Sequence, residues 1–273
     1  MPKRNPRLMS CPALFFTLFG LSLPLGSGAQ DLLVNGSFET GTFAGWTRAD
    51  QLNPADSANA DHFYLSTPGA NTPAVNGLTF KTAANAAGGN FYAVTASDLP
   101  GAHALLQSFT VPSGGGSLKL SFQMFVNDQS GIGPTVDPSG LDYTTGGSRV
   151  TRDNQHARVD ILRAGALNLS TSPADIVTSI YIGTDPSGFD ASFNIVPNAF
   201  TLYQVDLTNV LASGQSYRIR FAEVDNVSAL NQGVDNVHLL STTPEPGSLG
   251  LLTGLSVSGG LFLLRRNRRA ARI

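Results

Sequence analysis

The stretch LKLSFQMFV at Leu118–Val126 decides the fold class of this chain. Its apolar and polar side chains alternate, which is the period of a β-strand with one buried face. The segments Tyr217–Phe221 and Arg158–Ile161 repeat this alternation, and no stretch between residues 30 and 243 shows a sustained helical period. Gly, Pro, Asn and Asp clusters separate the runs. The pattern predicts an all-β, antiparallel β-sandwich.

Seven further runs have the length and composition of strands. They are Leu32–Val34, Phe63–Leu65, Phe91–Thr95, Ala104–Val111, Ile176–Ile182, Phe200–Leu207 and Val234–Leu240. Many short strands with turn residues between them are typical of one large sandwich domain, which we expect to occupy residues 30–243.

Two long polar segments separate some of these strands, Asn127–Asn154 and Gly183–Asn198. Each contains Asp-Pro-Ser-Gly, at 137–140 and at 185–188, and Asp followed by Pro favours a turn. Two interpretations stay open. The segments are either ligand-binding loops on a rigid scaffold or tolerated insertions.

The first 29 residues have the layout of a secretory signal peptide. Basic side chains precede an apolar run at Ala13–Leu25, and the small residues of Gly26–Ala29 follow it. We expect cleavage after Ala29. Cys11 stands before the apolar run rather than after it, so its position excludes a lipoprotein signal.

The last thirty residues, 244–273, combine three features in a fixed order. Pro244, Glu245 and Pro246 are followed by Gly247–Leu264, which carries no charge and is about as long as the shortest bilayer-spanning helix, roughly 17 to 20 residues. A basic cluster then ends the chain. Its members are Arg265, Arg266, Arg268 and Arg269. By the positive-inside tendency the arginines stay in the cytoplasm. Residues 30–243, called the body below, would then lie on the other side of the membrane.

This tail resembles the PEP-CTERM sorting signal of Gram-negative bacteria that make exopolysaccharide. The matching parts are the motif Pro244–Pro246, the apolar span and the terminal arginines. The resemblance implies transient anchoring in the inner membrane by a transmembrane helix, and processing by an exosortase near the motif. The alternative is an ordinary C-terminal anchor that stays in place.

Composition narrows the functions open to the body. Residues 30–243 carry nine basic and eighteen acidic side chains, a formal net charge of −9. Binding to a nucleic-acid backbone needs a basic face, so nucleic acid is not an expected partner. The only cysteine, Cys11, leaves with the signal peptide, which excludes disulfides, thiolate metal sites and a cysteine nucleophile from the mature body.

The two ends of the body carry a second resemblance. Leu33–Glu39 reads LVNGSFE and is followed by Gly45-Trp46, while Gly233–Leu239 reads GVDNVHL. This pair resembles the galactose-binding-like jelly-roll domains, which include several carbohydrate-binding modules. The resemblance implies that the first and last strands pair and that a structural calcium ion lies beside them.

The residues that match the acidic calcium ligands of those domains are Glu39 and Asp235. Calcium takes six to eight oxygen ligands from carboxylates and carbonyls, so these residue types suit it. The irregular segment Asn35-Gly36-Ser37 offers backbone carbonyls. In the alternative interpretation Glu39 caps a turn, Asp235 begins a strand, and both carboxylates are solvated.

Aromatic side chains are the candidates for stacking on a sugar ring. Trp46 is the only tryptophan, and its place after the opening motif favours packing in the core over contact with a ligand. Tyr143 and Phe189 lie in the two polar segments and are further ligand candidates.

The sequence offers little support for an enzyme. The histidines at 62, 103, 156 and 238 lack the spacing of a zinc site, and no GxSxG elbow occurs. Glu39 and Glu223 are the only glutamates of the body, so a glycosidase would have to rely on Asp pairs. We expect an exported, non-enzymatic protein of the envelope or exopolysaccharide matrix that binds carbohydrate or mediates adhesion. The alternatives are a carbohydrate-active enzyme on the same scaffold and a purely structural surface protein.

Overall fold

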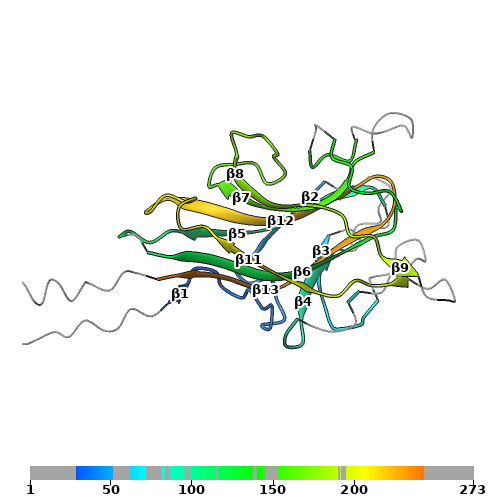
Figure 1. The fold of residues 1–273 in the computed structure, drawn as a ribbon, viewed down its shortest axis with the longest axis horizontal. Helices are drawn as coiled ribbons and strands as arrows, with labels where there is room; N and C mark the ends of the chain where they lie inside the picture. The colour runs from blue at the N-terminus through cyan, green and yellow to red at the C-terminus, as the bar shows by residue number, and fades with distance from the viewer. Residues whose placement is uncertain are drawn as a thin grey trace, which may run out of the picture. The chain divides into compact units, whose positions relative to one another are not determined.

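Two antiparallel β-sheets face each other in the computed structural model of the chain (Figure 1). The structure describes residues 29–51, 62–71, 82–83, 87–95, 99–114, 116–137, 140–144, 153–189, 191 and 195–242. These residues lie inside one unit, Ser27–Pro244. The predicted signal peptide, the motif Pro244–Pro246 and the terminal arginines lie outside the described residues. Within those residues, the structure contains no helix with the length and hydrophobicity needed to cross a bilayer.

Sheet 1 has the strand order β11-β6-β13-β4-β3, and β1 also pairs with β13. Its strands are β1 (Gln30–Asp31), β3 (Phe63–Ser66), β4 (Tyr92–Thr95), β6 (Leu118–Asp128), β11 (Thr201–Asp206) and β13 (Leu230–Ser241). Sheet 2 has the order β2-β5-β12-β7-β8. Its strands are β2 (Thr47–Gln51), β5 (Gly101–Thr110), β7 (Gln155–Arg163), β8 (Ile176–Gly183) and β12 (Ser216–Asp225). The predicted all-β class with antiparallel sheets is confirmed.

The main hydrophobic core lies between the two sheets, and the period-two pattern of the sequence supplies it. From β6 it takes Leu118, Leu120, Phe122, Met124 and Val126, which are all buried. Sheet 2 contributes Val159 and Ile161 from β7 together with Tyr217, Ile219 and Phe221 from β12. The rings of Phe122 and Phe221 meet edge to face with centroids 5.2 Å apart, an arrangement that favours the contact of the two sheets.

Most predicted strands are confirmed within one to three residues of their ends, but Leu32–Val34 is not a strand. Side chains replace the strand partner there. Asp31 Oδ1 accepts a hydrogen bond from Leu33 N at 3.1 Å. The Gln107 amide bonds both the N–H and the carbonyl of Val34, at 2.7 and 2.9 Å. Leu33 is buried in the core and Leu32 packs against it, whereas Val34 is 60% exposed, so core packing accounts for the first two apolar residues only.

Four of the strands were not predicted. One is β1, which lies just before the expected run Leu32–Val34. β2 is polar on both faces and carries no apolar alternation. The short strands β9 (Gly188–Phe189) and β10 (Ile195–Val196) pair with each other inside the segment expected to be a plain loop. The other polar segment starts later than expected, because β6 continues through Asn127 and Asp128.

The predicted pairing of the first and last strands is confirmed, since Gln30 pairs with Ser241 and Asp31 with Leu240. The register of β13 against β6 then shifts between Asp235 and His238, where Asn236 adopts a positive φ of 49°. This irregularity separates two parts of β13. Just after the shift, Val237 N donates to the carbonyl of Gly36 at 3.0 Å, which ties β13 to the turn that follows Asn35.

Candidate functional site

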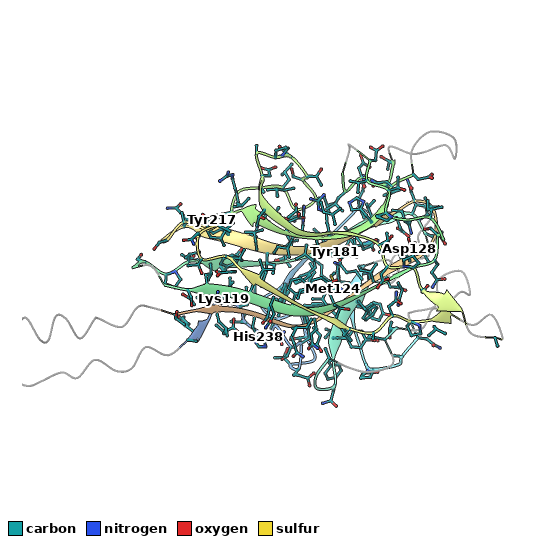
Figure 2. The ribbon with its side chains drawn as sticks, viewed as in Figure 1. Lys119, Met124, Asp128, Tyr181, Tyr217 and His238 are labelled. Atoms are coloured by element: carbon teal, nitrogen blue, oxygen red, sulfur yellow. The ribbon has the colours of Figure 1, made fainter. Side chains whose placement is uncertain are left out.

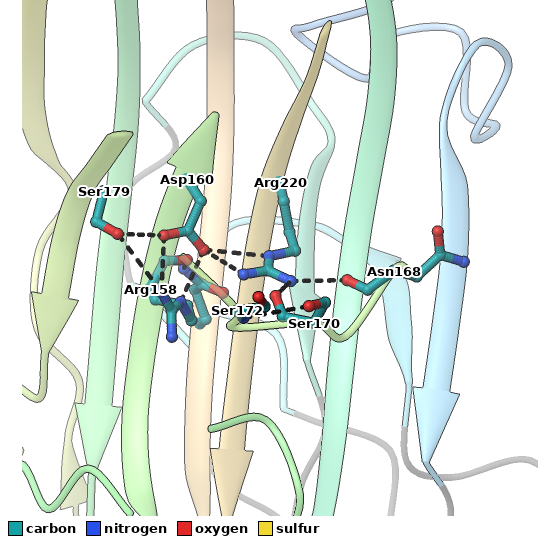
Figure 3. A network of polar contacts seen from close by, with 8 residues as sticks. Arg158, Asp160, Asn168, Ser170, Ser172, Ser179 and Arg220 are labelled. Carbon is teal, nitrogen blue, oxygen red and sulfur yellow. Dashed lines mark hydrogen bonds and ion pairs between the residues drawn. The ribbon is translucent and has the colours of Figure 1, made fainter. Parts of the chain in front are cut away.

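The outer face of sheet 2 is partly covered by the segment between β7 and β8. Arg220 on β12 donates from Nη1 to the carbonyls of Asn168 and Ser170, both at 2.8 Å (Figure 3). Arg218 donates to the side-chain oxygen of Asn168 at 2.6 Å and also to the Ala166 carbonyl. A small apolar cluster that includes Leu141, Leu162 and Ala222 packs under this cover. The segment between β7 and β8 therefore covers the part of this face over Arg218 and Arg220, while Ser108 and Thr110 at the end of β5 stay exposed.

A buried ion network lies under the same cover. Asp160 accepts from Arg158 at 2.7 and 2.9 Å and from Arg220 at 2.6 and 3.1 Å, and Ser179 Oγ donates to it at 2.7 Å (Figure 3). Burial alone would raise the pKa of Asp160, but the hydrogen bonds and charges of the two arginines outweigh it and lower the pKa. The network joins β7, β8 and β12, and Arg220 extends it to the covering segment through the carbonyls of Asn168 and Ser170.

The outer face of sheet 1 is open where β11, β6 and β13 run side by side. The registers of the three strands create rows of outward side chains across this face. One row is Asp206, Lys119 and Leu240, and the next is Gln204, Ser121 and His238. All of them are exposed except Ser121, which is half-buried. Figure 2 shows Lys119 and His238 on this layer.

A shallow groove of about 400 Å³ crosses this face. It is lined by Lys119, Leu120, Ser121, Gln204, Val205, Asp206 and Leu240. Ser121 is the short side chain of its row, with the longer side chains of Gln204 and His238 on either side. At its end Lys119 Nζ lies 2.5 Å from Asp206 Oδ2. Amide, hydroxyl and paired ionic groups beside an aliphatic side chain are suited to a polyhydroxylated ligand. The sequence did not reveal this groove.

The predicted calcium ligands lie near each other, Glu39 in the turn after β1 and Asp235 on β13. Glu39 Oε1 accepts from Asn90 N and Phe91 N, both at 2.8 Å, and these backbone bonds lower the pKa of Glu39. Asp235 is fully buried, and its Oδ1 accepts from Asn236 N at 2.7 Å. Burial raises the pKa of Asp235 to about 7, and the charge of Glu39 adds to this shift.

The alternative interpretation, a turn cap and a solvated residue at the start of a strand, fits only Glu39. Glu39 does cap a turn, but Asp235 is neither solvated nor at the start of a strand. Its Oδ2 is buried without a hydrogen-bond partner, and such an orphaned carboxylate oxygen next to a second carboxylate suits a hard cation. The carbonyls of Asn35 and Gly36 already accept bonds from Trp46 Nε1 and Val237 N. Within the described residues, no three His, Cys, Asp or Glu side chains form a metal-holding group, so further ligands would have to be carbonyls or water.

The aromatic candidates are placed differently from one another. Trp46 is 7% exposed and packs in the main core against Phe38 and Phe221, so its ring is covered. Tyr143 is half-buried against the small cluster on the outer side of sheet 2, where burial raises the pKa of its hydroxyl. Phe189 lies in β9, and its side chain is outside the described residues. Neither Trp46 nor Tyr143 lines the groove.

An Asp–His pair joins β2 to β5 in sheet 2. Asp50 Oδ1 is 2.9 Å from Nδ1 of His103, whose Nε2 is buried without a hydrogen-bond partner. Sequence reasoning missed this pair, because only the register of β2 with β5 brings the two residues together. His103 is fully buried, so a substrate cannot reach its imidazole in this structure.

No protein-family model and no curated protein matches the chain. Several solved structures resemble it. TmCBM61 in complex with β-1,4-galactotriose shares 13% identity and a TM-score of 0.42 over 78% of this chain and 99% of its own. The K1 cleaved adhesin domain of Lys-gingipain from Porphyromonas gingivalis W83 shares 13% identity and a TM-score of 0.40, over 78% and 97%.

A third similar structure is an enzyme, a Stig cyclase from Fischerella sp. TAU. It shares 17% identity and a TM-score of 0.43 over 80% of this chain and 100% of its own. Binding domains and an enzyme thus occur at the same level of likeness. At these identities and TM-scores, the likeness does not show which function this chain has.

Proposed function

We propose that the folded unit is a non-catalytic, carbohydrate-binding β-sandwich of the galactose-binding-like jelly-roll type. Its ligand is an extracellular polysaccharide. The observation that carries this proposal is the contrast between the two outer faces. Part of sheet 2 is covered by a segment that Arg220 bonds at Asn168 and Ser170, whereas sheet 1 presents an open groove in which polar side chains surround Leu240.

The groove supports binding rather than catalysis. A glycosidase needs two carboxyl groups about 5 to 10 Å apart, one of them able to donate a proton. Asp206 is the carboxylate that lines the groove, and Lys119 together with Thr208 lowers its pKa, which keeps it ionised. The rival function is a carbohydrate-active enzyme on the same scaffold. Bound sugar without turnover supports our proposal, and depolymerised polysaccharide supports the rival.

A structural calcium ion belongs to this proposal. Glu39 and Asp235 would hold it, with carbonyl or water oxygens completing the shell. Glu39 lies on the turn after β1, and Asp235 lies on β13, which pairs with β1. A bound cation would therefore neutralise two neighbouring carboxylates and stabilise the join between the two ends of the unit.

We also propose that the protein is exported and sorted through its C-terminal signal. The signal peptide would be removed after Ala29, and an exosortase would act near Pro244, Glu245 and Pro246 after transient anchoring in the inner membrane. The arginines from Arg265 to Arg269 would stop transfer. The body would then reach the cell surface or the exopolysaccharide matrix of a Gram-negative bacterium.

Intact-mass analysis of the protein from membranes and culture medium tests this processing. We expect a chain that begins at Gln30 in both fractions and one without the tail in the medium. A soluble cytosolic protein with both termini intact would contradict export and sorting together.

The binding proposal is tested by filling the groove. Ser121→Trp should reduce affinity for the bound polysaccharide at least tenfold in affinity electrophoresis. Ser108→Trp adds the same ring at an exposed position on the outer face of sheet 2 and should bind as the wild type does. Equal binding by both variants would show that the groove is not the polysaccharide-binding site.

A further inference from the structure

The cation that lines the groove is already neutralised within it. Lys119 Nζ contacts Asp206 Oδ2 at 2.5 Å. Asp206 in turn is held by Thr208, whose N–H and hydroxyl donate to Oδ1 at 3.0 and 2.5 Å. The carboxylate is thus fixed beside the lysine by the turn that follows β11.

The titratable group in the neighbouring row is also paired. His238 Nδ1 lies 2.7 Å from Oδ2 of Asp31, and the same aspartate accepts from Leu239 N at 3.0 Å. The other side chains facing the groove, Ser121 and Gln204, are uncharged hydrogen-bonding groups. Within the described part of this face, each basic side chain therefore has an acidic partner.

We infer that this groove selects neutral, hydroxyl-rich polysaccharide and disfavours chains that carry carboxylate or sulfate groups. The inference rests on the proposed carbohydrate binding at the same groove. An anionic sugar would have to displace Asp206 from Lys119 or place its own charge beside the Asp206 carboxylate. The body's net charge of −9 adds a longer-range repulsion. A neutral sugar pays neither cost, because its hydroxyl groups can donate to Asp206 and Gln204 and accept from Lys119 and Ser121.

A matched pair of polymers tests the selectivity. The full chain in detergent is titrated with neutral galactan and with polygalacturonate, the uronate form of a galactose polymer, at low and at physiological ionic strength. The wild type should favour galactan, and the preference should fall as salt screens the repulsion. Asp206→Asn keeps the shape of the side chain and releases Lys119 from its ion pair. We expect the affinity ratio to move toward polygalacturonate by at least about threefold.

Asp185→Asn is the matched control, because it changes the net charge equally at an exposed position outside the groove. It should leave the affinity ratio as in the wild type. Asp206→Ser gives a second test should the amide variant fold poorly.

The possible results separate the inference from the function on which it rests. Equal wild-type affinity for both polymers, lost in Ser121→Trp, would overturn the selectivity but keep the binding site. The same shift in Asp206→Asn and Asp185→Asn would also overturn it, because the selectivity would then come from net charge alone. If the wild type binds neither polymer, the proposed function is contradicted and this inference with it. The same holds if Ser121→Trp leaves the binding unchanged.

Discussion

The buried carboxylate of Asp235 lies close enough to Glu39 for the charge of Glu39 to raise its pKa, on top of the larger effect of burial. The pKa of Asp235 rises from 3.8 to about 7. Glu39 lies in the turn after β1 and Asp235 lies in the last strand. The repulsion between their carboxylates therefore acts where the two ends of the unit meet.

Without calcium, the stability of the fold should depend on pH through Asp235. Its folded pKa is raised, so the native state binds more protons than the unfolded state between about pH 4 and pH 7. The contribution of Asp235 is fully present below pH 4 and is lost as the pH rises through 7. The full shift corresponds to at most about 4 kcal/mol in the free energy of unfolding. Thermal melts in EDTA from pH 4 to pH 8 measure it.

Asp235→Asn removes the charge and should flatten this pH dependence. Calcium at pH 7.5 should raise the melting temperature of the wild type and leave that of the variant unchanged. Asp185→Asn, which changes an exposed acid elsewhere, should respond to calcium as the wild type does. A wild-type melting temperature that calcium does not change would contradict the proposed cation.

Removing the carboxylate of Asp160 from the buried ion network should lower the free energy of unfolding substantially. Asp160→Asn leaves Arg158 and Arg220 buried with no carboxylate between them, and breaking a buried pair in this way typically costs about 3–5 kcal/mol. Urea denaturation measures the change. Lys119→Met breaks the exposed pair with Asp206 and should cost no more than about 1 kcal/mol. A similar small loss in both variants would show that the network does not hold the cover of sheet 2.

The close approach of Gly36 to the last strand excludes any side chain there. A Cβ on Gly36 would lie 1.9 Å from the carbonyl oxygen of Val237, and the Gly36 carbonyl accepts from Val237 N at 3.0 Å. Gly36→Ala must push the two segments apart, and we expect a loss of at least about 2 kcal/mol in the free energy of unfolding. Gly165→Ala, with no atom near its added Cβ, should change it by less than about 0.5 kcal/mol.

Trp46 should report on folding and not on the ligand. Its ring packs between Phe38 and Phe221, and truncating such a side chain to Ala typically costs about 3–5 kcal/mol. Because Trp46 is the only tryptophan, the fluorescence of the chain measures its surroundings directly. Saturating polysaccharide should leave the emission maximum unchanged, while urea should shift it to the red. A shift of the emission maximum on addition of polysaccharide would contradict this prediction and indicate that Trp46 contacts the sugar.

Local periodicity was enough to predict the strands whose two faces differ, such as Leu118–Val126. It failed at Leu32–Val34, because the side chain of Gln107, more than seventy residues away, replaces a strand partner there. The groove could not be predicted from the sequence for a related reason. Ser121, Gln204 and His238 become neighbours only through the registers of β11 and β13 on β6. The sequence did name Glu39 and Asp235, but it gave no sign that one is exposed and the other fully buried.

The most direct test of the central claim is the affinity of the Ser121→Trp chain for neutral galactan, measured beside the wild type and Ser108→Trp. Our account predicts that the wild type and Ser108→Trp bind alike and that Ser121→Trp binds at least tenfold more weakly, with unchanged unfolding. Undiminished binding by a folded Ser121→Trp chain would contradict the assignment of the polysaccharide site to the open face of sheet 1.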